Sequence, residues 1–148
     1  MIRLAVAADT SAIGELLQHT IKGAANADVQ WIADRIDGPT GLVLIMSVNE
    51  SIQGFIVGQV VLDEAEIHDV GVEPALQRKG LGSKLISSFE QHASRKGATS
   101  CVLEVRASNV AALGAYHKAG YVEIGQRDRY YADGENAVLM RHDLLGAS

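Results

Sequence analysis

The chain has 148 residues, of which 47% are apolar and 21% charged. This length and composition predict one globular domain over residues 1–148, and no apolar run approaches the about 20 residues that a membrane helix needs. A single cysteine excludes an internal disulfide framework and a multi-cysteine metal site. The N-terminus lacks the uninterrupted apolar core of a signal peptide, so we expect a cytoplasmic protein that contacts no membrane.

The net charge of -5 is unevenly distributed. Residues 1–75 carry 3 Lys/Arg against 11 Asp/Glu, whereas residues 76–148 carry 10 against 7. An acidic chain is a poor nucleic-acid binder, because such binding depends on neutralising phosphates. The basic second half can hold a small phosphorylated ligand, although a chance scatter of solvated charge explains the asymmetry as well.

The first half of the chain predicts a short strand, two helices and three strands. Asp9 is the expected cap of the first helix, whose apolar face carries Ile13, Leu16, Leu17 and Ile21. Asp28 is the expected start of the second helix, which Gly38 and Pro39 end. The predicted ranges are strand 2–5, second helix 29–36, and strands 41–48, 52–62 and 66–72.

The second half predicts two helices that alternate with strands. A long helix follows residues 77–82, carries its apolar side chains on one stripe and stops at Gly97. The elements after it are strand 99–107, helix 109–119 and strands 121–126 and 137–143, with a turn at Asp133-Gly134. The order predicts an α/β fold with one mixed, mostly antiparallel sheet and helices on both faces.

The most informative stretch is VGVEPALQRKGLGSK at residues 70–84. A strand there enters a glycine-containing turn that opens onto a helix, whose free N–H groups favour an anion. Gly80 and Gly82 leave room for a phosphate, and Arg78, Lys79 and Lys84 add positive charge, so pyrophosphate is the expected ligand. A Walker loop and a dinucleotide fingerprint both fail at positions 83–85. Alternatively, the glycines only make the turn.

Residues 77–82, QRKGLG, resemble the Gln/Arg-x-x-Gly-x-Gly/Ala motif of the GNAT acetyltransferases. The stretch 60–140 is similar to the RimI-type enzymes of that superfamily, through VLDEA at 61–65, LEVRASN at 103–109 and the pair Tyr130-Tyr131. The resemblance implies a GNAT fold and an acetyl-CoA cosubstrate without a metal. It implies an acceptor that is the N-terminal alanine of a ribosomal protein. The residues implied to contact acetyl-CoA are Val70, Gly71, Val72, Arg78, Lys79, Gly80, Leu81, Gly82, Ser83 and Asn109.

Acetyl transfer to an amine needs a proton acceptor for the nitrogen and a proton donor for the departing thiolate. Glu104 is a carboxylate in an apolar run, where burial without a role is costly. A simple pairing with Arg106, on the same face of the strand, is the structural alternative. The resemblance implies that Glu104 is the proton acceptor. An ordinary glutamate has a pKa of about 4.3, so we expect it to act through a water.

Tyr116 lies seven residues after Asn109, on nearly the same side of the predicted helix. By pattern alone it is an aromatic residue of an amphipathic helix. The resemblance implies instead that it donates the proton to the thiolate. Tyr130 and Tyr131 are either paired strand aromatics or a wall for the acceptor backbone, and the resemblance favours the wall.

The chain departs from the RimI pattern after the first helix, where a Pro-Trp pair is replaced by GAANADVQW at 23–31. Trp31 is either a substitute for that tryptophan or a core residue. Two other functions therefore remain open: a GNAT enzyme for lysine or a small amine, and a non-catalytic acetyl-CoA-binding module. The presence of both Glu104 and Tyr116 argues against the binding module. A monomer is the default expectation, because the sequence carries no signal on oligomeric state.

Overall fold

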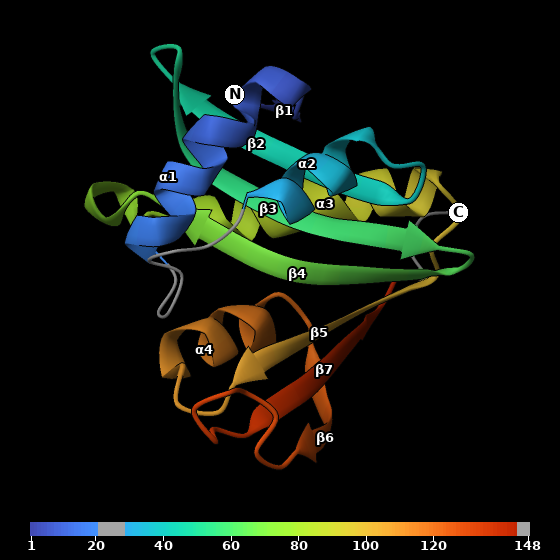
Figure 1. The fold of residues 1–148 in the computed structure, drawn as a ribbon. Helices are drawn as coiled ribbons and strands as arrows, with labels where there is room; N and C mark the ends of the chain where they lie inside the picture. Colours follow the sequence, from blue (N-terminus) through green and yellow to red (C-terminus); the bar gives the residue numbers. More distant parts are fainter. Residues whose placement is uncertain (21–28, 145–148) are drawn as a thin grey trace.

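The computed structural model describes residues 1–20 and 29–144. Figure 1 shows a sheet with helices packed on it. The strands are β1 (Ile2–Leu4), β2 (Gly41–Val48), β3 (Ser51–Val61), β4 (Glu64–Val72), β5 (Ser100–Arg106), β6 (Val122–Arg127) and β7 (Ala137–Asp143). The helices are α1 (Thr10–Thr20), α2 (Gln30–Asp37), α3 (Leu81–Arg95) and α4 (Val110–Lys118), with short 3-10 turns at Ala7–Asp9 and Pro74–Leu76.

The seven strands form one sheet in the order β1-β2-β3-β4-β5-β7-β6. Every neighbouring pair is antiparallel except β4 and β5, which run parallel. Alternating side chains leave an apolar layer on each face of the sheet. One layer packs under α1 and α2 and the other under α3 and α4. The predicted α/β class, with a mixed, mostly antiparallel sheet and helices on both faces, is confirmed.

The sheet opens between β4 and β5, where the two strands stop pairing. The two strands pair only from Glu64 to Ile67 on β4 and from Ser100 to Leu103 on β5. Beyond that point β5 continues along β7 and β4 continues along β3. The register of β3 with β4 also shifts at this level, because Gly58 faces Ile67 while Val57 faces Asp69. His68 is therefore the extra residue of a β-bulge, which bends β4 away from β5.

The predicted element order is confirmed, and the boundaries agree within two residues. The role predicted for Asp9 is wrong. It ends the 3-10 turn before α1, where its carboxylate accepts a hydrogen bond from the Val6 N–H at 2.8 Å and pairs with Arg3 at 2.8 Å. The nearby guanidinium and the bound N–H satisfy this carboxylate, so it does not cap α1. The predicted roles of Ile21 and Asp28 lie outside the described residues.

Candidate active site

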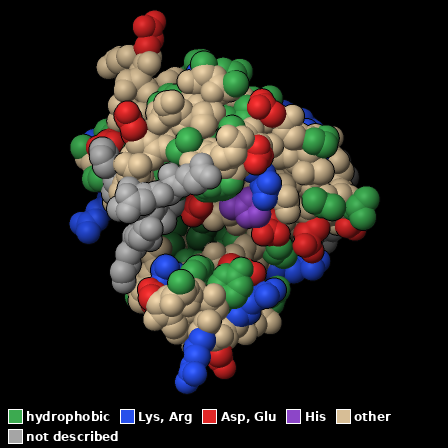
Figure 2. All heavy atoms as spheres, viewed as in Figure 1, with side chains coloured by type: hydrophobic (Ala, Val, Ile, Leu, Met, Phe, Trp, Pro, Cys, Tyr) green, Lys and Arg blue, Asp and Glu red, His purple; other side chains and the backbone are tan. Residues whose placement is uncertain are grey.

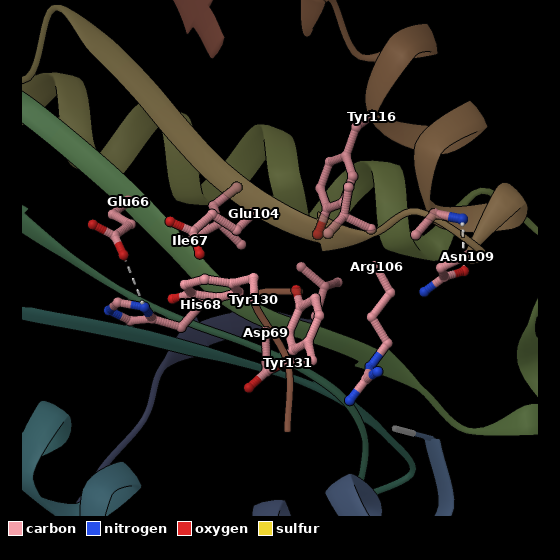
Figure 3. A pocket seen from close by; sticks show the side chains of 13 residues that line it. Glu66, Ile67, His68, Asp69, Glu104, Arg106, Asn109, Tyr116, Tyr130 and Tyr131 are labelled. Carbon is pink, nitrogen blue, oxygen red and sulfur yellow. Dashed lines mark hydrogen bonds and ion pairs between the residues drawn. The ribbon is translucent and has the colours of Figure 1, made fainter. Parts of the chain in front are cut away.

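A pocket of about 410 Å³ occupies the gap where β4 and β5 diverge. The space-filling view shows the hollow between the main body of the molecule and the part built from β5, β6, β7 and α4 (Figure 2). The pocket is lined by residues of four segments: β4, β5, the start and middle of α4, and the connection between β6 and β7. Figure 3 shows their side chains converging on one space. The divergence of two parallel strands thus creates the site.

The pocket reaches both faces of the sheet. Leu103 and Val105 belong to the apolar layer under α3 and α4, so Glu104 between them points to the α1 and α2 face. Asp69 pairs with Val57, which belongs to the layer under α1 and α2, so Asp69 points to that same face. Tyr116 instead enters from α4 on the other face. Carboxylates and a phenol therefore approach one gap from opposite sides.

Glu104 is held by two groups from the β6 side of the pocket. Its Oε1 lies 3.4 Å from Nε of Arg127, and its side chain is 27% exposed. Contact with the Glu104 carboxylate, chiefly through a hydrogen bond, raises the pKa of Tyr130. Glu104 is thus oriented but still reachable from the pocket. The alternative that Glu104 simply pairs with Arg106 is wrong, because Arg106 binds other carboxylates.

Arg106 anchors the segment that carries the two tyrosines. Its Nη1 lies 2.9 Å from Asp133 and 3.0 Å from Glu135, and its guanidinium stacks 4.1 Å from the ring centre of Tyr131. The rings of Tyr130 and Tyr131 meet edge to face, 5.1 Å apart. These contacts fix the connection between β6 and β7 against the mouth of the pocket. Both tyrosines line the site, as the predicted wall requires.

Tyr116 is both a core aromatic and a residue of the pocket. It is 9% exposed, and its ring packs edge to face against Tyr121 at 5.6 Å. Burial, followed by the negative charge of Asp69, raises its pKa above the ordinary value. Its hydroxyl therefore stays protonated at neutral pH and can act only as a donor to a stronger base. The two alternatives predicted for Tyr116 are compatible.

The face of the pocket towards α1 and α2 holds more titratable groups than the sequence predicted. Burial raises the pKa of Asp69 to about 7. Burial, then the charge of Glu104, raises the pKa of Glu66. Burial, then the charge of Arg35 from α2, lowers the pKa of His68, whose Nδ1 lies 3.3 Å from Glu66. The pattern that singled out Glu104, an acid in an apolar strand, could also have found Asp69.

Asp69 should make the stability of the protein depend on pH. Its pKa rises from 3.8 to about 7 on folding, so the folded state binds more protons between these values and loses stability as the pH rises through them. A difference of about three pKa units corresponds to at most about 4 kcal/mol. We expect Asp69→Asn to stabilise the protein at pH 8 and to change little near pH 4. Denaturant unfolding of both proteins at the two pH values measures this, and an equal effect at both would contradict it.

The glycine turn before α3 has the geometry of an anion site. Gly80, which precedes the helix, has a φ of 78° and no side chain caps the first turn. Apart from its chain neighbours and the backbone of its own helix, a Cβ placed on Gly82 would meet no atom of the described residues within 4 Å, so the space beside it is open. Gln77 donates a hydrogen bond from Nε2 to the Val72 carbonyl at 3.0 Å, which ties the turn to the end of β4. The N–H groups of the first turn are therefore free for a ligand.

The remaining predicted contact residues lie along the same gap. Val70, Gly71 and Val72 belong to the part of β4 that no longer pairs with β5. Asn109 lines the pocket and caps α4, because its Oδ1 accepts a hydrogen bond from the Ala112 N–H at 3.1 Å. Its side-chain amide group remains a possible donor. Arg78, Lys79 and Ser83 are exposed around the turn, and Leu81 packs partly against the core.

Three further observations concern expectations from the sequence. Trp31 packs against the apolar layer under α1 and α2, as the core interpretation predicts. Among the described residues, no group of three or more His, Cys, Asp or Glu side chains is arranged to hold a metal ion. No helix in residues 1–20 and 29–144 is long and apolar enough to span a bilayer.

Comparison with known proteins decides the family. Residues 12–121 match the model of the acetyltransferase (GNAT) family. The chain belongs to this family. It is 39% identical over 98 residues to the [ribosomal protein bS18]-alanine N-acetyltransferase of Escherichia coli K12, a match that covers 64% of this chain and 66% of that protein. The corresponding Salmonella typhimurium protein is 38% identical over 106 residues, covering 70% and 72%.

The structural comparison agrees with the family. The crystal structure of the ribosomal-protein-S18-alanine N-acetyltransferase from Escherichia coli superposes with a TM-score of 0.89 at 30% identity, over 100% of this chain and 96% of that chain. The two proteins thus share one fold over nearly their whole length. The expected GNAT membership and its similarity to RimI-type enzymes are confirmed.

Proposed function

We propose that this GNAT protein transfers the acetyl group of acetyl-CoA to the N-terminal α-amine of an alanine-starting ribosomal protein. The observation that carries the proposal is the gap between β4 and β5, which Glu104 and Tyr116 line from opposite faces of the sheet. Direct transfer needs one group beside the attacking nitrogen and another beside the departing sulfur. The names of the similar proteins from Escherichia coli and Salmonella typhimurium support the choice of acceptor.

The residues around the glycine turn fit acetyl-CoA. The open first turn of α3 suits the pyrophosphate, with contacts from the segment Arg78 to Ser83. The unpaired edge of β4 from Val70 to Val72 suits the pantetheine arm, because its amides can form sheet-like hydrogen bonds. From the edge of β4, the pantetheine arm would extend along the gap past Asn109 to Tyr116. The thioester would then lie between Tyr116 and the carboxylates of the other face.

Gly82→Val tests the pyrophosphate site. The added side chain meets open space in the protein, so we expect the fold to persist and acetyl-CoA affinity to fall at least tenfold. Ser87→Val, on an exposed position of the same helix, controls for the cost of a β-branched residue in α3. Calorimetric titration with acetyl-CoA gives both affinities. An unchanged affinity in a folded Gly82→Val protein would exclude this placement of the pyrophosphate.

Glu104 and Tyr116 supply the two proton transfers of the proposed reaction. Glu104, held by Arg127 and Tyr130, takes a proton from the nitrogen as it bonds to the thioester carbonyl carbon. Tyr116 gives its phenolic proton to the sulfur as the carbon–sulfur bond breaks. The burial that keeps Tyr116 protonated also disfavours a free thiolate, which makes the departing sulfur a stronger base in this pocket.

The acetyl acceptor is an α-amine, because an α-amine is deprotonated more easily at neutral pH than a lysine amine. A peptide α-amine has a pKa of about 7.7–8.0, whereas the lysine amine at about 10.4 is neutral about once in 2,500 molecules at pH 7. The carboxylates on the α1 and α2 face attract the positively charged end of a peptide. Tyr130 and Tyr131 then provide the wall against which the first residues lie. A ribosomal acceptor places the enzyme in the cytoplasm.

The second candidate is acetylation of lysine or a small amine. It is favoured by the departure from the RimI pattern at residues 23–31, most of which lie outside the described residues. Release of CoA measured with an alanine-starting ribosomal peptide, an N-terminally blocked lysine peptide and small amines distinguishes the two. We expect the alanine-starting peptide to have the highest kcat/KM. A preference for the blocked peptide or the small amines would replace this function with the second.

A further inference from the structure

Asp69 is the one carboxylate of the pocket for which the proposed reaction has no role and the described structure provides no partner. It projects from the bulged part of β4 into the gap, on the face opposite Tyr116. No hydrogen bond or ion pair joins it to any residue in 1–20 or 29–144, and burial is the cause that raises its pKa. A carboxylate kept in such a place without a partner costs stability. This cost suggests a ligand that is present only during function.

The charged and titratable groups around Asp69 define what that ligand can be. Those in or beside the same pocket are Glu66 and His68 of β4, Glu104 and Arg106 of β5, Tyr116 of α4, Tyr130 and Tyr131 and, from α2, Arg35. The buried side chains that α1 packs on this face are apolar. Arg106 pairs with Asp133 and Glu135, and Arg127 pairs with Glu104. The charge of Arg35 acts on Glu66 and His68, and no ion pair joins it to Asp69. A cation that enters the pocket from this face therefore meets Asp69 as a carboxylate without a counter-ion.

We propose that Asp69 binds the ammonium group of the acceptor and removes its first proton, before Glu104 acts. This inference rests on the proposed function, because it concerns the same amine. At neutral pH most α-amines are protonated and have no lone pair for attack. The amine must lose one proton before the nitrogen bonds to carbon and a second proton afterwards. Asp69 and Glu104 lie on the same face of the sheet and can accept these two protons.

Three side chains accept or donate the protons of the proposed reaction. The Asp69 carboxylate takes a proton from the ammonium and becomes a neutral acid. The nitrogen then bonds to the thioester carbonyl carbon, and its second proton passes to Glu104. The carbon–sulfur bond breaks as the sulfur takes the proton of Tyr116. One of the two protons held by Asp69 and Glu104 then returns to Tyr116, and the other leaves to the solvent. The pKa of about 7 for Asp69 lies close to that of an α-amine, so the first transfer is nearly balanced.

The test is the pH dependence of kcat/KM for Asp69→Asn with an alanine-starting peptide. We expect the wild-type value to rise through an apparent pKa near 7, and the variant value to rise through the pKa of the amine itself, about 7.7–8.0. The variant should then be about four- to eightfold slower at pH 6.5 and nearly equal to the wild type above about pH 9. Asp63→Asn, in the exposed turn before β4, is the matched control and should change nothing.

A second peptide substrate distinguishes the loss of proton removal from a structural effect of the substitution at Asp69. A peptide that starts with β-fluoroalanine has an amine of lower pKa, so more of it is neutral before it binds. The deficit of Asp69→Asn, and of the second variant Asp69→Ser, should shrink with this peptide, while melting temperatures confirm that both proteins fold. A deficit that is equal for both peptides and at every pH would overturn the role of Asp69. If the wild type acetylates neither peptide, the proposed function itself is wrong and this inference falls with it.

Discussion

Glu104→Gln should lower the turnover of acetyl transfer by about 10²- to 10⁴-fold and leave acetyl-CoA affinity unchanged. The substitution keeps the size of the side chain and removes its ability to accept a proton. Glu104 points to the α1 and α2 face, opposite the face that carries α3 and the glycine turn before it. The substitution should therefore lower turnover without changing the affinity for acetyl-CoA. Steady-state kinetics and calorimetry of the same preparation measure the two.

The control for Glu104→Gln is Glu64→Gln, which changes an exposed glutamate at the start of β4 outside the pocket. Turnover of this control should equal that of the wild type. Loss of the carboxylate at position 104 also frees Arg127, whose side chain is 55% exposed, so its pairing at 3.4 Å contributes little stability. Unfolding measurements should thus give nearly the same free energy for Glu104→Gln and the wild type. Normal turnover in Glu104→Gln would remove Glu104 from the reaction.

Tyr116→Phe should slow turnover by about 10²-fold or more, because the departing sulfur loses its positioned proton donor. The aromatic ring stays, and with it the packing against Tyr121 at 5.6 Å. The Tyr116 hydroxyl makes no hydrogen bond to any described residue and faces the pocket, so its loss should cost little stability. The measurement is turnover alongside acetyl-CoA affinity, which should remain near that of the wild type.

Tyr121→Phe is the control for Tyr116→Phe, and we expect it to lower stability and leave turnover unchanged. The Tyr121 side chain is buried, and its hydroxyl donates a hydrogen bond at 2.9 Å to the half-buried carboxylate of Glu90. Removal of this hydroxyl should lower the free energy of unfolding by about 1 kcal/mol, since the half-buried Glu90 carboxylate loses one partner and keeps His142 at 2.7 Å. Turnover should be unchanged. Equal turnover in Tyr116→Phe and the wild type would contradict the donor role of Tyr116.

Local patterns predicted the order of the elements and most boundaries. The stripe from Leu81 to Ala93 fixed the buried face of α3, because a helical period places those side chains on one side. The alternation in β5 placed Glu104 opposite Leu103 and Val105 for the same kind of reason. Asp9 was misassigned because its partner, Arg3, lies on a separate strand. A helix cap depends on the residues next to it in the sequence, whereas the pairing of Asp9 with Arg3 depends on how β1 packs beside the 3-10 turn.

The pocket itself lay beyond what the sequence predicts. Its shape depends on where β4 stops pairing with β5 and on the bulge at His68, and neither leaves a mark in hydrophobic spacing. The partners of Arg106 are 27 and 29 residues away, in a connection without regular structure. Asp69 carried a signal, an acid in the strand 66–72, but nothing in the sequence indicated that its carboxylate would face the same gap as Glu104.

The most direct test of the proposed function is the position of the acetyl group on a peptide that offers both kinds of amine. The peptide begins with alanine, continues with a ribosomal N-terminal sequence and contains internal lysines. After incubation with acetyl-CoA and the protein, fragmentation mass spectrometry locates the added acetyl group. We predict acetylation of the first nitrogen, with the lysines unmodified. Acetyl groups found mainly on internal lysines, or no modification of a peptide under conditions where small amines are acetylated, would contradict N-terminal alanine acetylation and leave the GNAT fold in place.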